Sequence, residues 1–218
     1  MTLEMRSFVI NLDRRPDRYE RFCSEMALPS CTRVSAVDSR DIVWTDELRA
    51  RVCDWNFAHI PLIVKNVVAC CLSHLAVWET VRTLDVPCVA VFEDDATWIQ
   101  GSFDLDSLSF PSEFGLIWLN NLIQDGRRAL TPTASPAAVS SVSVIPHSHY
   151  QYTTEGYIIT PAFAGRLCSE IAHYLGAVDA HMAQAISKVE NESGRTVAFQ
   201  VWPPLVCQFD RSDTDVQR

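Results

Sequence analysis

Three consecutive carboxylates, Glu93, Asp94 and Asp95, follow an apolar run from Val86 to Phe92. The run is typical of a buried strand, and in open α/β sheets ligands bind beyond the carboxyl ends of the strands. Adjacent carboxylates repel one another, and their hard oxygen atoms suit Mg²⁺ or Mn²⁺. The segment therefore indicates a divalent-metal site, with a solvated acidic turn as the alternative. Strand alternation, if it continues this far, sends Glu93 and Asp95 to one side and Asp94 to the other.

A charged segment from Asn11 to Arg18 follows the first apolar strand and opens a helix. Arg14 and Arg18 are four residues apart, so they share one face if the helix begins early enough. A helix N-terminus together with guanidinium groups is a natural phosphate site. The alternative is a surface salt-bridge run with Asp13 and Asp17.

The longest helical pattern, Lys65 to Leu84, contains the segment Cys70 to Glu79. Apolar and aromatic residues recur there at spacings of three and four, which places on one face Val67, Cys71, His74, Trp78 and Val81. A histidine on such a face is more often packed in the core than catalytic. Both interpretations of His74 therefore stay open.

Strands and helices are expected to alternate along the chain. We expect strands over residues 7–12, 31–38, 88–92, 115–119, 141–145, 156–160 and 196–201. We expect helices over residues 16–26, 45–53, 65–84, 161–174 and 179–189. The alternation predicts an α/β sandwich with a mainly parallel central sheet. Because no domain boundary is evident, residues 1–218 are expected to form a single domain.

The composition limits the classes of partner. The 218 residues are 48% hydrophobic and 21% charged, enough for a substantial core, and the net charge is −9. An acidic chain has no general attraction to nucleic acid or anionic lipid, and an anionic substrate needs a local cation to dock. No apolar stretch reaches the length of about 18 residues that a membrane span requires.

Cysteine usage and the N-terminal segment bear on the compartment. Eight cysteines occur without a C-x-x-C pair. The first residues, MTLEMRSFVINL, carry an acid early and enter a strand at once, so we expect no signal peptide. We therefore expect free thiols in a reducing compartment, and a cytoplasmic location.

These segments, together and in this order, resemble glycosyltransferase family 25, which includes lipopolysaccharide-biosynthesis and collagen-type galactosyltransferases. The family's pattern begins with a strand ending in Ile-Asn-Leu, then an Arg and an Asp-Arg pair, then a Ser-His-x-x-x-Trp-Glu helix, then an apolar strand running into Glu-Asp-Asp. These motifs are matched by Ile10–Leu12, Arg14, Asp17-Arg18, Ser73–Glu79 and Glu93–Asp95, and later ones by Tyr157–Ile159, Ala164–Leu167, Val178-Asp179 and Pro204–Gln208. The family's Gly-Glu-x-Gly lead is replaced here by residues 66–69, NVVA, so the loop that touches the donor is expected to differ.

The resemblance implies a GT-A-like α/β/α fold, a nucleotide-sugar donor that is commonly UDP-linked, and transfer with inversion. It also implies that Mn²⁺ or Mg²⁺ acts as a Lewis acid on the leaving diphosphate. We therefore expect Asp95 to be the best metal contact, and Glu93 or Asp94 to contact the metal or the ribose. Asp210, after the last strand, completes the metal shell in this scheme.

The resemblance further assigns residues to the donor and the acceptor. The residues expected at the nucleotide site are Asn11, Leu12, Arg14, Arg18, Ser73, Glu93 and Asp94, with His74 nearby. Inversion by a single displacement requires a general base for the acceptor hydroxyl, and Asp179 is the first choice, with His74 as the alternative. Asp179 stands at a predicted helix N-terminus, where an N-cap role is the commoner one. The acceptor is a glycan, a protein or another hydroxyl compound, and the sequence does not choose among them.

Two other function classes remain open. A metal-dependent nucleotidyltransferase or phosphohydrolase also places acids at strand ends, but the chain has seven glycines and no G-x-G-x-x-G or P-loop pattern. A non-catalytic, glycosyltransferase-like module that binds a nucleotide or sugar is favoured by the missing Gly-Glu lead. The intact Glu93–Asp95 segment argues against that module.

Overall fold

The computed structural model describes residues 5–52, 61–99, 101–120, 142–146, 153–171 and 175–209, and only the backbone of residues 61–63. A seven-stranded sheet forms its centre, in the order β2-β1-β3-β7-β5-β8-β6. Its strands are β1 (Ser7–Asn11), β2 (Cys31–Ser35), β3 (Val89–Glu93), β5 (Leu116–Trp118), β6 (Ser143–Pro146), β7 (Gly156–Ile159) and β8 (Ala198–Trp202). Two further strands, β4 (Ala96–Trp98) and β9 (Val206–Gln208), pair separately.

The central sheet is mixed, with one direction dominant. The strands β2, β1 and β3 are parallel, as are β5 and β8, whereas β7 runs antiparallel to both β3 and β5 and β6 runs antiparallel to β8. Five of the seven strands therefore point the same way. The two antiparallel strands are β7, which lies between β3 and β5, and β6, which lies at the edge of the sheet.

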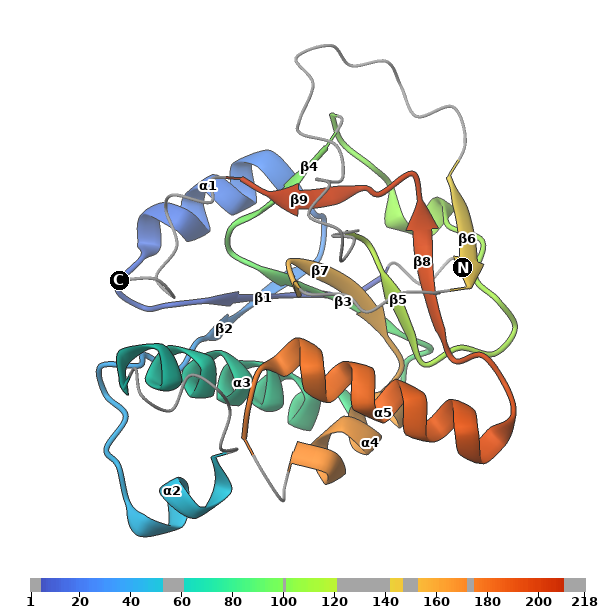
Figure 1. Cartoon of the computed structure of the whole chain (residues 1–218). Helices are drawn as coiled ribbons and strands as arrows, with labels where there is room; N and C mark the ends of the chain where they lie inside the picture. Colours follow the sequence, from blue (N-terminus) through green and yellow to red (C-terminus); the bar gives the residue numbers. More distant parts are fainter. Residues whose placement is uncertain are drawn as a thin grey trace.

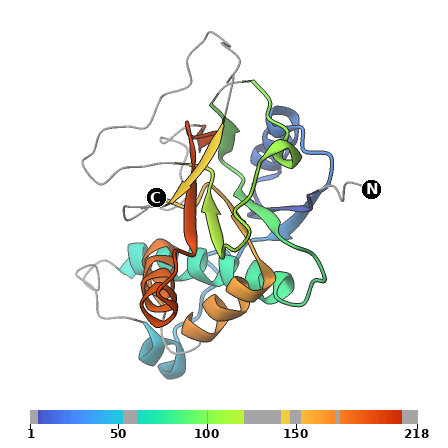
Figure 2. The same ribbon diagram turned by 90° about the vertical axis from the view of Figure 1, so that its right-hand side faces the viewer.

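Helices and the small sheet cover the two faces of the central sheet (Figure 1). One face carries α3 (Pro61–Val81), α4 (Pro161–Ile171) and α5 (Val178–Ser193), which pack against one another. The other face carries α1 (Pro16–Met26) and the β4–β9 pair. The turned view keeps the three helices on one side and α1 on the other (Figure 2). These layers confirm the predicted α/β sandwich.

Strand alternation divides the core into two parts. Val91 and Tyr157 belong to the cluster under α3, α4 and α5, whereas Phe92 and Ile158 belong to the cluster under α1 and the small sheet. All four side chains are completely buried. Both faces of the sheet are therefore covered, which explains why β3 and β7 read as continuous apolar runs.

Most predicted elements are present, with shifted ends. The helix α1 begins at Pro16 and ends at Met26, as predicted, and Thr45 caps the short helix α2 (Asp46–Arg51) by accepting a hydrogen bond from the Leu48 amide. The helix α3 begins four residues earlier than predicted, at Pro61. The predicted strands omitted β4 and β9, and the 3₁₀ turn Leu105–Ser107 was not predicted either.

Two further expectations concerned free thiols and membrane spans. The seven cysteines within the described ranges are free, as predicted, whereas Cys53 lies outside those ranges. No described helix combines the length and apolar content that crossing a bilayer requires.

Candidate active site

A cleft of about 490 Å³ opens where β1 and β3 end. Its walls come from the β1–α1 turn, the middle of α3, the turn after β3, residues 153–155, the start of α5 and the end of β9. Most of the predicted site residues line it, namely Leu12, Arg14, Arg18, Ser73, His74, Glu93, Asp94, Asp95 and Asp179. Asn11 lies beneath the cleft, and Asp210 lies outside the described residues.

Arg18 joins the two aspartates of the acidic segment. Its Nη2 lies 2.5 Å from Asp94 Oδ1 and 3.0 Å from Asp95 Oδ2, and all three side chains are buried. Arg18 is only 5% exposed, so the alternative of a surface salt-bridge run is wrong for this residue. Arg18 projects from the first turn of α1, because the helix begins at Pro16.

The carboxylate of Asp95 has one oxygen engaged and one without a partner. Oδ2 faces Arg18 and accepts a hydrogen bond of 2.8 Å from Gln208 Nε2. Oδ1 is buried and has no hydrogen-bond partner among the described residues. Burial, and then the charge of Glu93, raise the pKa of Asp95 to about 7.

An unsatisfied buried carboxylate oxygen is costly, and a hard divalent cation would satisfy it. The oxygen-donor chemistry at Asp95 thus fits Mn²⁺ or Mg²⁺. Arg18 and Gln208 hold Oδ2, which leaves Oδ1 as the atom available to a cation.

The acidic segment is divided differently from the predicted alternation. The strand β3 ends at Glu93, and Asp94 and Asp95 form a turn before β4. Glu93 reaches the α3 side, where its Oε1 lies 3.2 Å from His74 Nε2. Asp95 instead joins Asp94 at Arg18, on the α1 side, so the expectation that Glu93 and Asp95 share one side is wrong. The turn ends the strand geometry on which the alternation depended.

A buried chain of hydrogen bonds leads to Glu93. The indole of Trp78 donates to the hydroxyl of Tyr157 at 2.9 Å, and this hydroxyl lies 2.8 Å from His74 Nδ1. Because an indole can only donate, the Tyr157 proton is free to go to Nδ1, which places the imidazole proton on Nε2 and toward Glu93. Thr154 also donates to Glu93 Oε1. Burial alone raises the pKa of Glu93, but the hydrogen bonds from His74 and Thr154 outweigh it and lower the pKa.

Asn11 and Ser73 use their side chains to hold the cleft walls. Asn11 Nδ2 donates to Asp94 Oδ2 at 2.6 Å and to the Arg15 carbonyl at 2.9 Å. Ser73 Oγ donates to the Ala69 carbonyl at 2.7 Å and accepts from the Val37 amide at 2.8 Å. The side chains of these two predicted donor contacts are therefore engaged in holding the walls of the cleft.

Arg14 stands at the rim of the cleft. It precedes α1, and its Nε donates to Asp38 Oδ2 at 2.8 Å. Hydrogen bonds from Arg40 and Arg14 hold the pKa of Asp38 well below its usual range, although burial opposes them. Arg14 is therefore a cation fixed at the cleft edge by a charged partner.

Asp179 lies in the first turn of α5 and lines the cleft. The N-cap position is Ala177, so the N-cap interpretation of Asp179 is wrong. Its Oδ1 accepts from the Ala180 amide at 2.8 Å. Burial raises the pKa of Asp179 to about 6, in spite of the backbone hydrogen bonds that lower it.

Two cleft residues, Glu155 and Gln208, were not predicted as site residues. Glu155 is buried, its Oε2 accepts from Asn120 Nδ2, and burial followed by the charge of Glu93 raises its pKa. Gln208 was noted only as part of the tail motif, and β9 brings it opposite Ala96, one residue from Asp95. Glu155 precedes the buried strand β7, and an acid at that boundary was the available hint.

Comparison with known proteins identifies the family of the chain. The family model described as glycosyltransferase family 25 (LPS biosynthesis protein) matches residues 5–182, so the chain belongs to this family. The resemblance drawn from the sequence is thereby confirmed.

Two relatives are informative. A Bos taurus protein named "Probable inactive glycosyltransferase 25 family member 3" is 33% identical over 171 residues, covering 73% of this chain and 28% of the relative. Procollagen galactosyltransferase 2 of Mus musculus is 27% identical over 172 residues, covering 73% of this chain and 27% of the relative. The chain thus spans between a quarter and a third of the length of these relatives.

A solved structure also overlaps with the chain. It is a Drosophila galactosyltransferase 7 variant in complex with manganese, UDP-Gal and xylobiose, and it covers 99% of this chain and 76% of its own, with 11% identity and a TM-score of 0.46. The fold described above rests on its own layers and strand order, without this overlap.

Proposed function

We propose that the protein is an inverting glycosyltransferase that moves a hexose from a UDP-linked donor to an acceptor hydroxyl with the assistance of Mn²⁺ or Mg²⁺. The observation that carries this proposal is Asp95 Oδ1, a buried carboxylate oxygen without a described partner in a family 25 cleft. A glycan, a protein or another hydroxyl compound serves as acceptor. The free cysteines support the cytoplasmic location that we propose with it.

Asp95 is the first contact for the cation, and Arg14 stands at the rim as a cation for the donor's phosphates. When bound, the divalent cation stabilises the negative charge that grows on the leaving diphosphate. Arg18 keeps Asp95 in place and offsets part of its charge. Glu93, proposed as a second metal contact from the sequence, faces the His74 imidazole and the Thr154 hydroxyl on the α3 side, so we rank Asp95 first for the hard cation.

Asp179 suits the role of general base better than His74. A base works best when its pKa lies near the working pH, and Asp179, with a pKa of about 6, is mostly deprotonated at neutral pH. His74 is 1% exposed, and both of its ring nitrogens face partners. Asp179 would therefore accept the proton of the acceptor hydroxyl.

The test is the response of the wild type and of Asp95→Asn to UDP and Mn²⁺. We expect UDP to raise the melting temperature of the wild type only with Mn²⁺, and a screen of UDP-sugars to show Mn²⁺-dependent hydrolysis. Asp95→Asn should lose both responses, whereas Asp106→Asn, a change at an exposed aspartate, should keep them. An unchanged response in Asp95→Asn would overturn the assignment.

A non-catalytic binding module is the second candidate, and the name of the bovine relative, which is given as probably inactive, favours it. Such a module would show the Mn²⁺-dependent shift with UDP and no turnover of any UDP-sugar. Hydrolysis or transfer with any UDP-sugar would exclude it.

A further inference from the structure

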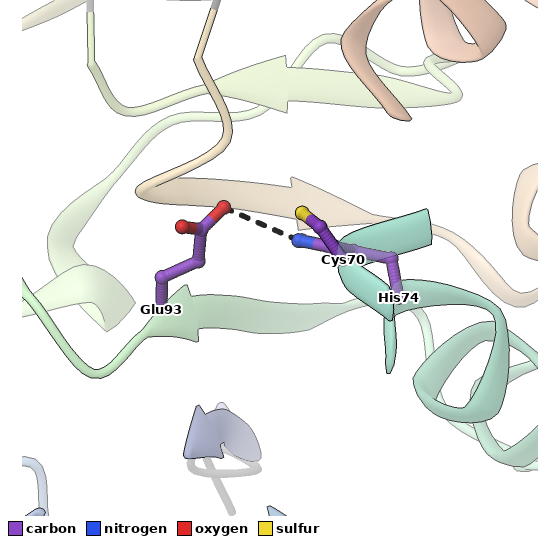
Figure 3. A group of neighbouring side chains, drawn as sticks. All are labelled: Cys70, His74 and Glu93. Carbon is purple, nitrogen blue, oxygen red and sulfur yellow. Dashed lines mark hydrogen bonds and ion pairs between the residues drawn. The ribbon is translucent and has the colours of Figure 1, made fainter. Parts of the chain in front are cut away.

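Three side chains of different chemistry converge on one wall of the cleft (Figure 3). Cys70 and His74 are four residues apart on α3, so they share a face, and Glu93 meets them from the end of β3. The Cys70 sulfur, a His74 ring nitrogen and a Glu93 carboxylate oxygen all lie within 4.8 Å of one another. All three residues line the cleft, so the group is open to a small solute.

We propose that Cys70, His74 and Glu93 bind a Zn²⁺ ion. Thiolate, imidazole and carboxylate are the ligands that Zn²⁺ prefers, and three protein ligands with one open position are usual for zinc sites that face a cleft. Tetrahedral bond lengths of 2.0–2.3 Å place neighbouring ligand atoms about 3.3–3.8 Å apart, so small side-chain rotations suffice. One thiolate and one carboxylate also balance the charge of the ion.

The surroundings of His74 and Glu93 support this assignment. Zinc-bound histidines have their second ring nitrogen held by a hydrogen-bonding partner, and carboxylate ligands are themselves hydrogen-bonded. Tyr157 takes that place at His74 Nδ1 and is itself fixed by Trp78. Thr154 takes it at Glu93. Zn²⁺ on Nε2 moves the imidazole proton to Nδ1, which then donates it to the Tyr157 hydroxyl oxygen. The side chains of His74 and Glu93 are therefore already held in place, and binding of the ion changes only the tautomer of His74.

The Zn²⁺ site differs in chemistry from the Asp95 position. Asp95 offers an oxygen beside the guanidinium of Arg18, which suits a hard ion that keeps its water and phosphate ligands. The Cys70 group offers sulfur and nitrogen, which Mn²⁺ and Mg²⁺ bind poorly. One cleft thus carries two cation positions of opposite preference.

Cobalt(II) is the probe for this site, because a cobalt–thiolate bond gives a charge-transfer absorption in the near ultraviolet and Zn²⁺ displaces cobalt. We expect one equivalent of cobalt to give this band in the wild type, in Asp95→Asn and in Cys23→Ser, a matched change at an exposed free cysteine. Cys70→Ser should lose the band and bind Zn²⁺ at least about 100-fold more weakly in competition with a chromophoric chelator. A wild type without the band, or Cys70→Ser with unchanged Zn²⁺ affinity, would overturn the proposal.

The outcome is separable from the proposed transferase function. Cys70→Ser should keep the Mn²⁺-dependent response to UDP, since Asp95 is unaltered. A missing UDP response in the wild type would count against the transferase and leave the cobalt spectrum unchanged. A missing cobalt band would count against the zinc site and leave the UDP response unchanged.

Discussion

The two walls of the cleft are built from adjacent residues of one segment but follow different physical rules. The α1 wall is ionic, with the guanidinium of Arg18 between the carboxylates of Asp94 and Asp95. The α3 wall is a chain of hydrogen bonds that runs from the Trp78 indole through Tyr157 and His74 to Glu93. The turn after β3 directs Glu93 to one wall and the two aspartates to the other.

The carboxyl groups titrate differently on the two walls. Burial raises the pKa of Asp94 and of Asp95 even with Arg18 beside them, because one cation serves two carboxylates. Burial acts on Glu93 as well, but His74 and Thr154 outweigh it. Glu93 precedes the turn and finds hydrogen-bond donors, whereas Asp94 and Asp95 lie in the turn and share the cation of Arg18. Their place in the segment therefore decides which carboxylate a further cation would stabilise.

The largest expected effect is on the ionic wall. Arg18→Met leaves two buried carboxylates without their cation, which should lower the free energy of unfolding by about 3–5 kcal/mol. Urea denaturation at pH 8 measures it. The pKa values of both aspartates rise further in the variant, so its folded state gains protons and its deficit should shrink as the pH falls toward 5.

Arg82→Met is the matched control for the ionic wall. Arg82 pairs with Glu79 at 2.5 Å, but both side chains are nearly half exposed. Its loss should change stability by at most about 0.5 kcal/mol. Equal effects of the two substitutions would remove the distinction between a buried ionic wall and an ordinary surface pair.

The next effect is on the hydrogen-bonded wall. Tyr157→Phe removes only a hydroxyl group, but it leaves the Trp78 indole and His74 Nδ1 without their partner in a fully buried place. We expect a loss of about 2 kcal/mol in the free energy of unfolding. Because the hydroxyl group that is removed and the Trp78 indole carry no charge, this loss should vary little between 50 mM and 500 mM salt, over which the screening length changes about threefold.

Tyr19→Phe is the control for the hydrogen-bonded wall, since Tyr19 is a half-buried tyrosine on α1. Its effect should stay within about 0.5 kcal/mol. If Tyr157→Phe behaved in the same way, the chain of hydrogen bonds would contribute nothing specific to this wall.

The sequence predicted most of the helices and strands of the central layers and the place of the acids, because these depend on local patterns. The apolar run before Glu93 marks β3, and Pro16 marks the start of α1. The burial of Arg18 was not predictable, since it depends on the direction in which the first turn of α1 faces once the helix packs on the sheet. The partition of the acidic segment also escaped prediction, because it follows from a turn at Asp94 that no local pattern marks.

The contacts missed from the sequence are long-range or lie on very short elements. Gln208 reaches Asp95 across 113 residues of chain, on a three-residue strand that follows two prolines. Tyr157 meets His74 only because β7 inserts beside β3. Asp179 was placed at the correct helix, yet the helix begins one residue earlier than predicted and so shifts its role away from the cap.

The smallest expected effect on stability is that of Asp179, in the first turn of α5. Its pKa of about 6 exceeds the ordinary value near 3.8 because burial disfavours the charge, and Glu93 adds to the shift while His74 opposes it. As a general base Asp179 must be deprotonated, so the kcat/KM for transfer should fall about tenfold between pH 7 and pH 5.

The contribution of Asp179 to stability changes in the opposite direction. The raised pKa favours the folded state at low pH, and this contribution is lost as the pH rises from about 4 to about 6. Asp179→Asn should therefore lose activity at every pH, yet melt no lower than the wild type at pH 8. A variant that kept the wild-type pH profile would assign the base to another residue and leave Asp179 as a structural carboxylate of α5.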